Sequence, residues 1–325
     1  MMEAQPLLPR LDWGAEKGSY ESCHLALQMI GKLPTRLLPW VNHGWHVALR
    51  VGPRGFETYP MPAGGGRTFT VTFDVCAMAL VAACSRGGRW DVPVQGTTIA
   101  GLHAALCETL KEAGLPAPLH GSPNELPDPV PFHRDDRSRE WDADALARLH
   151  GAFRFADCVF NRFRALYLGK TSPSHLFWGS FDLAVTRFSG RKAPVHPGGI
   201  PNLPDAVTRE AYSHEVISAG FWPGDVTGGG GVEEAAFYAY AYPVPDALGD
   251  GPVQPDAAYW LGDLGEWVLP YAALHDADDA QEMLMTFLQS TYDAAADRLD
   301  WPEGMIVPTV TIGQPGYDPA DRRDE

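Results

Sequence analysis

The residues best suited to chemistry lie between Ser174 and Arg191, where polar and apolar side chains alternate. On a β-strand, successive side chains point to opposite faces. The face that carries functional groups would then hold Trp178, Ser180, Asp182, Ala184 and Thr186. A carboxylate and a hydroxyl beside an indole are costly to bury unless a partner or a ligand satisfies them. This pattern predicts a polar, aromatic patch able to bind a small molecule.

A second strand-like run adds aromatic hydroxyl groups to this hypothesis. Between Ala236 and Tyr242, alternation places Tyr238, Tyr240 and Tyr242 on one face. Aromatic rings with a few convergent polar groups typically line small-molecule pockets. We therefore expect a pocket near the junction of the two halves of the chain. Its expected ligand-binding residues are Trp178, Ser180, Arg187, Arg191, Tyr238 and Tyr240.

Within this pocket, Asp182 or His214 would act as the general acid or base, and Arg187 or Arg191 would bind an anionic group. The same residues admit a structural interpretation, in which Asp182 pairs with one of these basic residues and the tyrosines line a half-exposed sheet. The sequence leaves both hypotheses open: a small-molecule-binding protein or enzyme, or a non-enzymatic structural or interaction protein. It identifies no reaction and no cofactor.

Metal and nucleotide chemistry have weaker support. A metal site needs several His, Cys, Asp or Glu side chains that converge on one point, and the chain has neither an HExxH nor a CxxC motif. The remaining metal hypothesis is a composite site of His43, His175 and His214. Gly169-Lys170-Thr171 matches the end of a phosphate-binding loop, but Arg164 stands where that motif requires its first glycine, so we reject the motif.

Long strings around these residues resemble the bacterial DUF5996 family, whose function is unknown. The strings are NHGWH (42–46), HLFWGSFDLAVTRFSGR (175–191), YSHEVISAGFWPG (212–224), FYAYAYP (237–243) and FLQSTY (287–292). The resemblance covers nearly the whole chain and implies one family unit rather than two independent modules. It implies no activity, cofactor or catalytic residue.

Four helices that could position these residues are indicated by apolar side chains at three- and four-residue steps. They are Tyr20 to Leu33, Thr97 or Thr98 to Gly114, Leu146 to Tyr167, and a last helix that begins among Asp276, Asp278 and Asp279. Gly31 and Pro34 predict the end of the first helix. A threonine can cap the second helix, and acidic residues suit the N-terminus of the last.

Strand-like runs lie between these helices. They are Trp45 to Val51, Phe56 to Pro60, Phe69 to Ala83 with a break within it, and Trp90 to Val94 in the first half, and Leu176 to Arg187, His214 to Phe221, Ala236 to Tyr242 and Trp267 to Tyr271 in the second. Both halves therefore have the order helix, strands, helix, which suggests an internal duplication. The predicted fold class is α+β, with two similar halves whose mainly antiparallel sheets pack against the helices.

The length of 325 residues exceeds a typical domain of about 100–200 residues, which agrees with two halves. The predicted organisation is an N-terminal half (1–119), a proline- and charge-rich linker or wrapping arm (120–142), a C-terminal half (143–312) and an acidic, disordered tail (313–325).

The amino-acid composition limits the expected cellular location of the protein and the classes of partner that it could bind. With 25 Lys and Arg against 41 Asp and Glu, the formal net charge of -16 repels phosphate backbones and anionic membranes, so we expect no nucleic-acid or membrane partner. No apolar run approaches the roughly 20 residues needed to cross a bilayer. The N-terminus lacks the apolar core of a secretory signal, so a cytoplasmic location is expected. A small molecule is the expected partner, and the sequence does not set the oligomeric state.

Overall fold

The computed structural model describes residues 8–119, 121–199, 203–225 and 232–306, so the predicted tail (313–325) lies outside the described residues. The α-helices are α1 (Trp13–Leu37), α2 (Ile99–Glu112), α3 (Ala143–Ala165), α4 (Asp205–Ala211) and α5 (Ala280–Arg298). The first sheet contains β1 (Arg50–Val51), β2 (Gly55–Glu57), β3 (Met61–Pro62), β4 (Thr68–Asp74), β5 (Ala79–Cys84) and β6 (Arg89–Pro93). The second contains β7 (His175–Phe177), β8 (Asp182–Lys192), β9 (His214–Trp222), β10 (Ala236–Tyr242), β11 (Tyr259–Leu261) and β12 (Glu266–Pro270). Short 3-10 helices occupy Asn42–Gly44, Phe132–Arg134, Leu248–Asp250 and Tyr271–Asp276.

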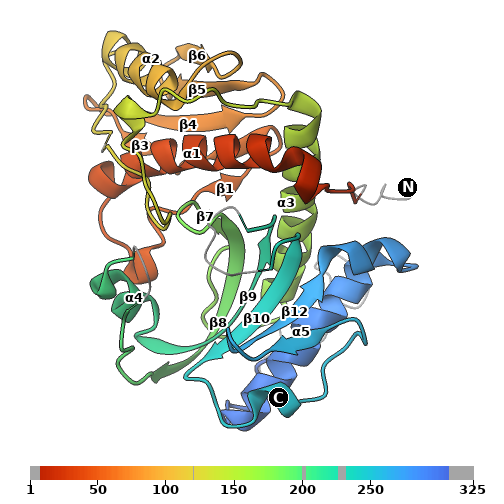
Figure 1. Cartoon of the computed structure of the whole chain (residues 1–325). Coiled ribbons are helices and arrows are strands. Elements are labelled where there is room, and N and C mark those ends of the chain that lie inside the picture. Colours follow the sequence, from red (N-terminus) through yellow and green to blue (C-terminus); the bar gives the residue numbers. More distant parts are fainter. Residues whose placement is uncertain (1–7, 120, 200–202, 226–231, 307–325) are drawn as a thin grey trace, which may run out of the picture.

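Both sheets pair their described strands antiparallel. The first sheet has the order β1-β2-β4-β5-β6 with β3 on β4, and the second has the order β11-β12-β10-β9-β8-β7. Figure 1 shows the first sheet with α2 at one end of the molecule and the second sheet with α5 at the other. The predicted α+β class with antiparallel sheets packed against helices is confirmed. The internal duplication stays a prediction.

Side-chain caps explain where two of the helices begin. The Thr98 hydroxyl accepts a hydrogen bond from the Gly101 N–H at 3.0 Å, before α2. Asp279 accepts from the N–H groups of Gln281 and Glu282 at 3.0 and 3.1 Å, before α5. Each cap satisfies backbone donors that have no partner within the helix. Both starts agree with the sequence-based expectation.

The first helix is longer than its pattern predicts. α1 begins at Trp13 and continues through Gly31 and Pro34, so the predicted end at these two residues is wrong. Pro34 lies in the last turn, where its missing N–H removes a single helical hydrogen bond, and its carbonyl still accepts from the Leu38 N–H at 2.9 Å. In Figure 1, α1 lies across the molecule between the first sheet and the second half. Its position lets it contribute to a site on the second sheet.

The predicted strand from Leu176 to Arg187 is two strands in the structure. β7 ends at Phe177, β8 begins at Asp182, and the two strands pair antiparallel. Phe181 closes the intervening turn with a φ of 62° and donates its N–H to the Phe177 carbonyl at 2.8 Å. The unbroken strand is therefore wrong, because the chain reverses direction at residues 178–181.

Several contacts join the two halves. Leu49 and Leu176 exchange backbone hydrogen bonds of 2.9 and 2.8 Å, and α3 packs against α1, α5 and β8. Residues 121–142, here called the arm, bury Phe132 and Trp141 in the same hydrophobic core that contains both sheets. Among the described residues, no helix has both the length and the apolar composition that a membrane crossing requires.

Candidate functional site

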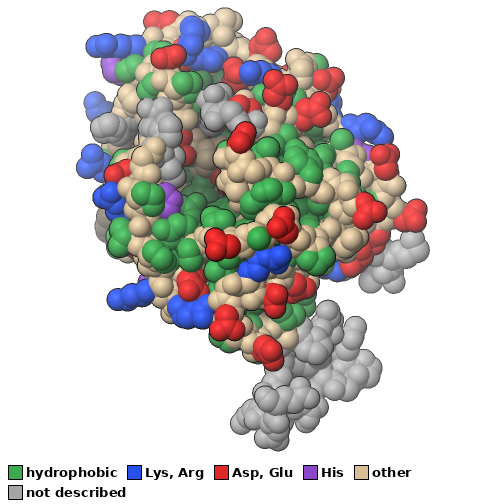
Figure 2. Space-filling model, turned by 60° about the horizontal axis from the view of Figure 1, so that its bottom comes forward, with side chains coloured by type: hydrophobic (Ala, Val, Ile, Leu, Met, Phe, Trp, Pro, Cys, Tyr) green, Lys and Arg blue, Asp and Glu red, His purple; other side chains and the backbone are tan. Residues whose placement is uncertain are grey.

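A cavity of about 660 Å³ lies between α1 and the second sheet. Its walls come from the last turns of α1, residues 40–47, the arm, the β7–β8 turn, α4 and the facing strands β8, β9 and β10. Figure 2 shows a face of the molecule that is hollowed, with hydrophobic side chains gathered around the hollow. The volume lies within the range of about 300–1,000 Å³ that is usual for small-molecule sites.

Strand register explains which side chains form the cavity floor. Two rows of residues cross β8, β9 and β10: Ala184–Gly220–Tyr238 and Thr186–Ser218–Tyr240. Within the second row, the hydroxyl groups of Thr186 and Ser218 are hydrogen bonded at 2.8 Å. The Tyr212 hydroxyl, from the end of α4, donates to the Tyr240 hydroxyl at 3.1 Å. The floor therefore combines aromatic rings with a row of hydroxyl groups.

Gly220 allows Tyr238 to reach Asp182. A Cβ atom at Gly220 would lie 2.5 Å from Cε1 of Tyr238, so the tyrosine ring lies directly over the glycine backbone. The Tyr238 hydroxyl donates a hydrogen bond to one carboxylate oxygen of Asp182, and the Ser180 hydroxyl donates to the other. Asp182 is 6% exposed. Burial raises the pKa of Asp182, and the two hydrogen bonds oppose that shift.

Two further carboxyl groups line the cavity. Glu266 begins β12, and its Oε2 is buried without a hydrogen-bond partner among the described residues. Burial, followed by the nearby charge of Asp182, raises the pKa of Glu266 to about 8. Glu125 comes from the arm. The same two causes raise the pKa of Glu125 to about 7, while Lys32 opposes the shift.

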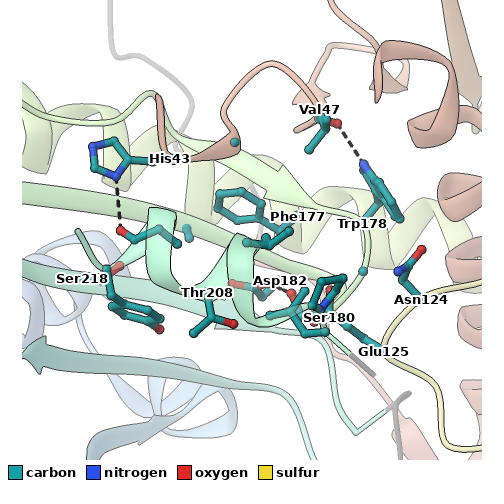
Figure 3. Close-up of a pocket in the computed structure, with 18 of the residues that line it drawn as sticks. His43, Val47, Asn124, Glu125, Phe177, Trp178, Ser180, Asp182, Thr208 and Ser218 are labelled. Atoms are coloured by element: carbon teal, nitrogen blue, oxygen red, sulfur yellow. Dashed lines mark hydrogen bonds between the residues drawn. The ribbon is translucent and has the colours of Figure 1, made fainter. Parts of the chain in front are cut away.

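Lys32 of α1 lies beside the arm. Its Nζ donates a hydrogen bond to the side-chain oxygen of Asn124 and lies 4.9 Å from the centre of the Trp178 ring. Burial lowers the pKa of Lys32 to about 8, and the charge of Glu125 opposes this shift. The Trp178 indole N–H donates to the Val47 carbonyl at 2.8 Å, which fixes the ring (Figure 3). These contacts hold one end of the cavity in place.

Aromatic faces border the acidic groups. The rings of Trp222 and Tyr238 are 4.4 Å apart at 31°, and those of Tyr238 and Tyr240 are 6.1 Å apart at 16°. In Figure 3, Ser180, Asp182 and Glu125 lie toward one end of the cavity and His43 toward the other. The site thus has an acidic, aromatic end and a separate end near α4.

The structure brings together most of the residues predicted for the pocket. The cavity lining includes Trp178, Ser180, Asp182, Ala184, Thr186, Tyr238 and Tyr240. Asp182, Ala184 and Thr186 reach it by strand alternation, whereas Trp178 and Ser180 reach it through the β7–β8 turn. Sequence reasoning missed Lys32 on the first predicted helix, Glu125 in the proline-rich arm, and Glu266, which directly precedes the predicted strand from Trp267.

The two arginines predicted to bind an anionic group do not line the cavity. Arg187 follows Thr186 on β8 and therefore points to the opposite face, where its guanidinium centre lies 3.4 Å from the Phe163 ring centre. It is fully buried and donates to the Phe163 carbonyl at 2.6 Å. Arg191 forms an ion pair with Glu215 at 2.8 Å and hydrogen bonds to the carbonyl groups at the end of α5. Both side chains have structural partners.

The structure does not bring the three histidines of the predicted metal site together around one point. His43 lines the cavity, and its ring lies 5.9 Å from that of His214, which is not among the lining residues. His175 is buried against Trp45 and Phe177. In the part of the chain that the structure describes, no group of three or more His, Cys, Asp and Glu side chains could hold a metal ion. The composite metal site of these three histidines is therefore wrong.

A family model described as "Family of unknown function (DUF5996)" matches residues 8–307 of the chain. No curated protein and no solved structure matches it.

Proposed function

The chain belongs to the DUF5996 family, and because that description names no function, we propose from the cavity itself that the protein binds a small organic molecule. The observation that carries this proposal is a cavity of about 660 Å³ lined by aromatic side chains and by Glu266, whose buried Oε2 has no hydrogen-bond partner among the described residues. A buried polar atom without a partner costs about 1–3 kcal/mol. A ligand that donates a hydrogen bond to Glu266 would remove this cost.

The ionisable groups also suit proton transfer. Glu125 and Glu266, with pKa values raised to about 7 and about 8, change protonation state near neutral pH. Groups of this kind are suited to general acid–base catalysis. We therefore extend the acid–base role proposed for Asp182 to these two residues. Ligand binding does not depend on that role.

A second candidate function is that of a non-enzymatic structural or interaction protein. It draws support from Asp182, both of whose carboxylate oxygens already accept hydrogen bonds from Ser180 and Tyr238. Unfilled volume beside Glu266 favours the binding function instead. A cytoplasmic location remains a proposal, and the net charge of -16 supports the proposed absence of a nucleic-acid partner.

A thermal-shift screen with a metabolite library tests the binding function, because a ligand that binds only the folded state raises the unfolding temperature. Ala184→Leu places extra volume in the cavity, and Ala104→Leu makes the same change on the exposed face of α2. We expect ligands that stabilise the wild type and Ala104→Leu equally, and that lose their effect on Ala184→Leu. A library without ligands, or ligands that are indifferent to Ala184→Leu, would contradict the proposal.

A further inference from the structure

Building on the proposed binding function, we propose that the ligand is a protonated organic amine. Its ammonium group binds beside Glu266 and Asp182, against the tyrosine faces of β10, and its apolar or aromatic body fills the remaining cavity. This inference rests on the charge balance of the cavity and on the arrangement of its rings.

The two sides of the cavity differ in the charged side chains that they carry. Among the described lining residues, the lysine and arginine side chains are Lys32 and Arg36, and both come from α1. Lys32 is engaged by Asn124 and lies near Glu125, while Arg36 is exposed. On the sheet side, the described residues provide no cation beside Glu266 or Asp182: Asp182 accepts hydrogen bonds from neutral hydroxyl groups. A cationic ligand would supply the positive charge that ionised Glu266 lacks among the described residues.

The aromatic rings favour an organic cation. The faces of aromatic rings carry partial negative charge and attract ammonium groups within about 6 Å of the ring centre. The ring centres of Tyr238 and Tyr240 lie 6.1 Å apart with nearly parallel planes, and the ring centre of Trp222 lies 4.4 Å from that of Tyr238. All three rings line the same cavity as Glu266. Carboxylates next to such rings form a typical environment for a substituted ammonium group.

Two other classes of ligand fit less well. A divalent metal ion needs several ligands around one point, and the described His, Cys, Asp and Glu residues offer no such group. An anionic ligand would lie against the carboxyl groups of Glu266 and Asp182, while the predicted anion-binding residues Arg187 and Arg191 lie outside the lining. The cavity of about 660 Å³ also has room for an organic body attached to the charge.

Three probes of similar shape test the charge preference: phenethylammonium, 2-phenylethanol and 3-phenylpropanoate, measured by isothermal titration calorimetry at about pH 6 and about pH 8.5. Because Glu266 must be ionised to pair with the cation, its pKa of about 8 predicts that affinity for phenethylammonium falls nearly tenfold per pH unit below that value. At about pH 8.5 we expect phenethylammonium to bind at least about tenfold more tightly than 2-phenylethanol. The affinity of 2-phenylethanol should depend little on pH.

Glu266→Gln and Asp263→Asn form a matched pair, because Asp263 is an exposed acid in the same β11–β12 hairpin. Glu266→Gln should remove both the preference for the ammonium and its pH dependence, whereas Asp263→Asn should keep them. Equal binding of the ammonium and the alcohol, or a preference that survives Glu266→Gln, overturns the amine class and leaves the binding function intact. If none of the three probes binds, the ligands found in the thermal-shift screen test the inference through their charge. Cationic ligands whose stabilising effect is lost in Glu266→Gln support the amine class, and neutral or anionic ligands overturn it. If no compound of the library raises the unfolding temperature, both the binding function and the amine class are overturned.

Discussion

Replacing Gly220 by alanine tests whether the absence of a side chain at this position of β9 allows Tyr238 to reach the carboxylate of Asp182. Gly220 lies within the strand ladder and has none of the positive φ values found at other glycines, so alanine fits its backbone conformation. The cost arises from Tyr238, because the new Cβ would lie 2.5 Å from Cε1 of its ring. Moving the ring breaks the hydrogen bond from Tyr238 to the buried Asp182.

The size of the effect follows from these two losses. Overpacking of a filled site costs about 1–3 kcal/mol, and a hydrogen bond to a charged group contributes about 1.5–3 kcal/mol. We therefore expect Gly220→Ala to lower the free energy of unfolding by about 2.5–6 kcal/mol. In a Tyr238→Ala background the ring is absent, and the same substitution should be neutral or stabilising by up to about 1 kcal/mol, because alanine has less conformational entropy to lose.

Urea unfolding followed by circular dichroism measures all four variants of this double-mutant cycle. Gly262→Ala provides a control, since a Cβ there would meet Trp260 only at ordinary contact distances of 3.7 and 3.9 Å. The control should change stability by less than about 0.5 kcal/mol. An equal cost of Gly220→Ala with and without the Tyr238 ring would refute the reasoning, because the cost would then lie in the backbone.

Three further predictions concern groups whose environment differs from solvent. Arg187→Ala should lower the free energy of unfolding by about 3–5 kcal/mol, because it empties a buried site and leaves the Phe163 carbonyl with only the longer, 3.4 Å hydrogen bond from the Leu166 N–H. Urea unfolding measures this, and a loss below about 1 kcal/mol would contradict it. Because the pKa of Glu266 rises from about 4.3 in the unfolded chain to about 8 in the folded one, the wild type should lose stability as pH rises between these values. Glu266→Gln should therefore gain stability relative to the wild type over that range; a difference that is constant between about pH 5 and pH 8.5 would refute the assignment. Burial lowers the pKa of His24 to about 4, so its contribution to stability is present above the unfolded value of about 6.5 and is lost as pH falls toward 4. NMR of the imidazole ring should show neutral His24 down to about pH 5, and protonation near pH 6.5 would contradict this.

Features that depend on neighbouring residues in the chain could be predicted from the sequence. Thr98 and Asp279 cap their helices through hydrogen bonds that span two or three residues. The residue type at the start of each helix is therefore enough to predict these caps. Alternation separates polar from apolar faces on β8 and therefore predicts the cavity position of Asp182. The same alternation should have excluded Arg187, which directly follows Thr186 and therefore cannot share its face.

Features that depend on distant segments could not be predicted in the same way. Glu125 and Lys32 approach each other because the arm folds back onto α1, where the Asn124 N–H donates to the Gln28 side chain at 2.7 Å. No periodicity in a proline-rich segment indicates which surface it will cover. Glu266 did carry a signal, since it precedes the predicted strand from Trp267 and alternation places it on the face opposite Trp267.

The arm, which links α2 to α3, also supplies Asn124 and Glu125 to the cavity wall, at the end where Asp182 of the second sheet lies. Fragments produced by dividing the polypeptide after residue 119 would each carry an incomplete set of walls. A ligand in the cavity would contact both α1 and the strands β8, β9 and β10, and would therefore hold the two halves together non-covalently. Occupancy should therefore slow proteolytic cleavage within the connecting segment, even though that segment is rich in the prolines and charges usually found at accessible cleavage sites.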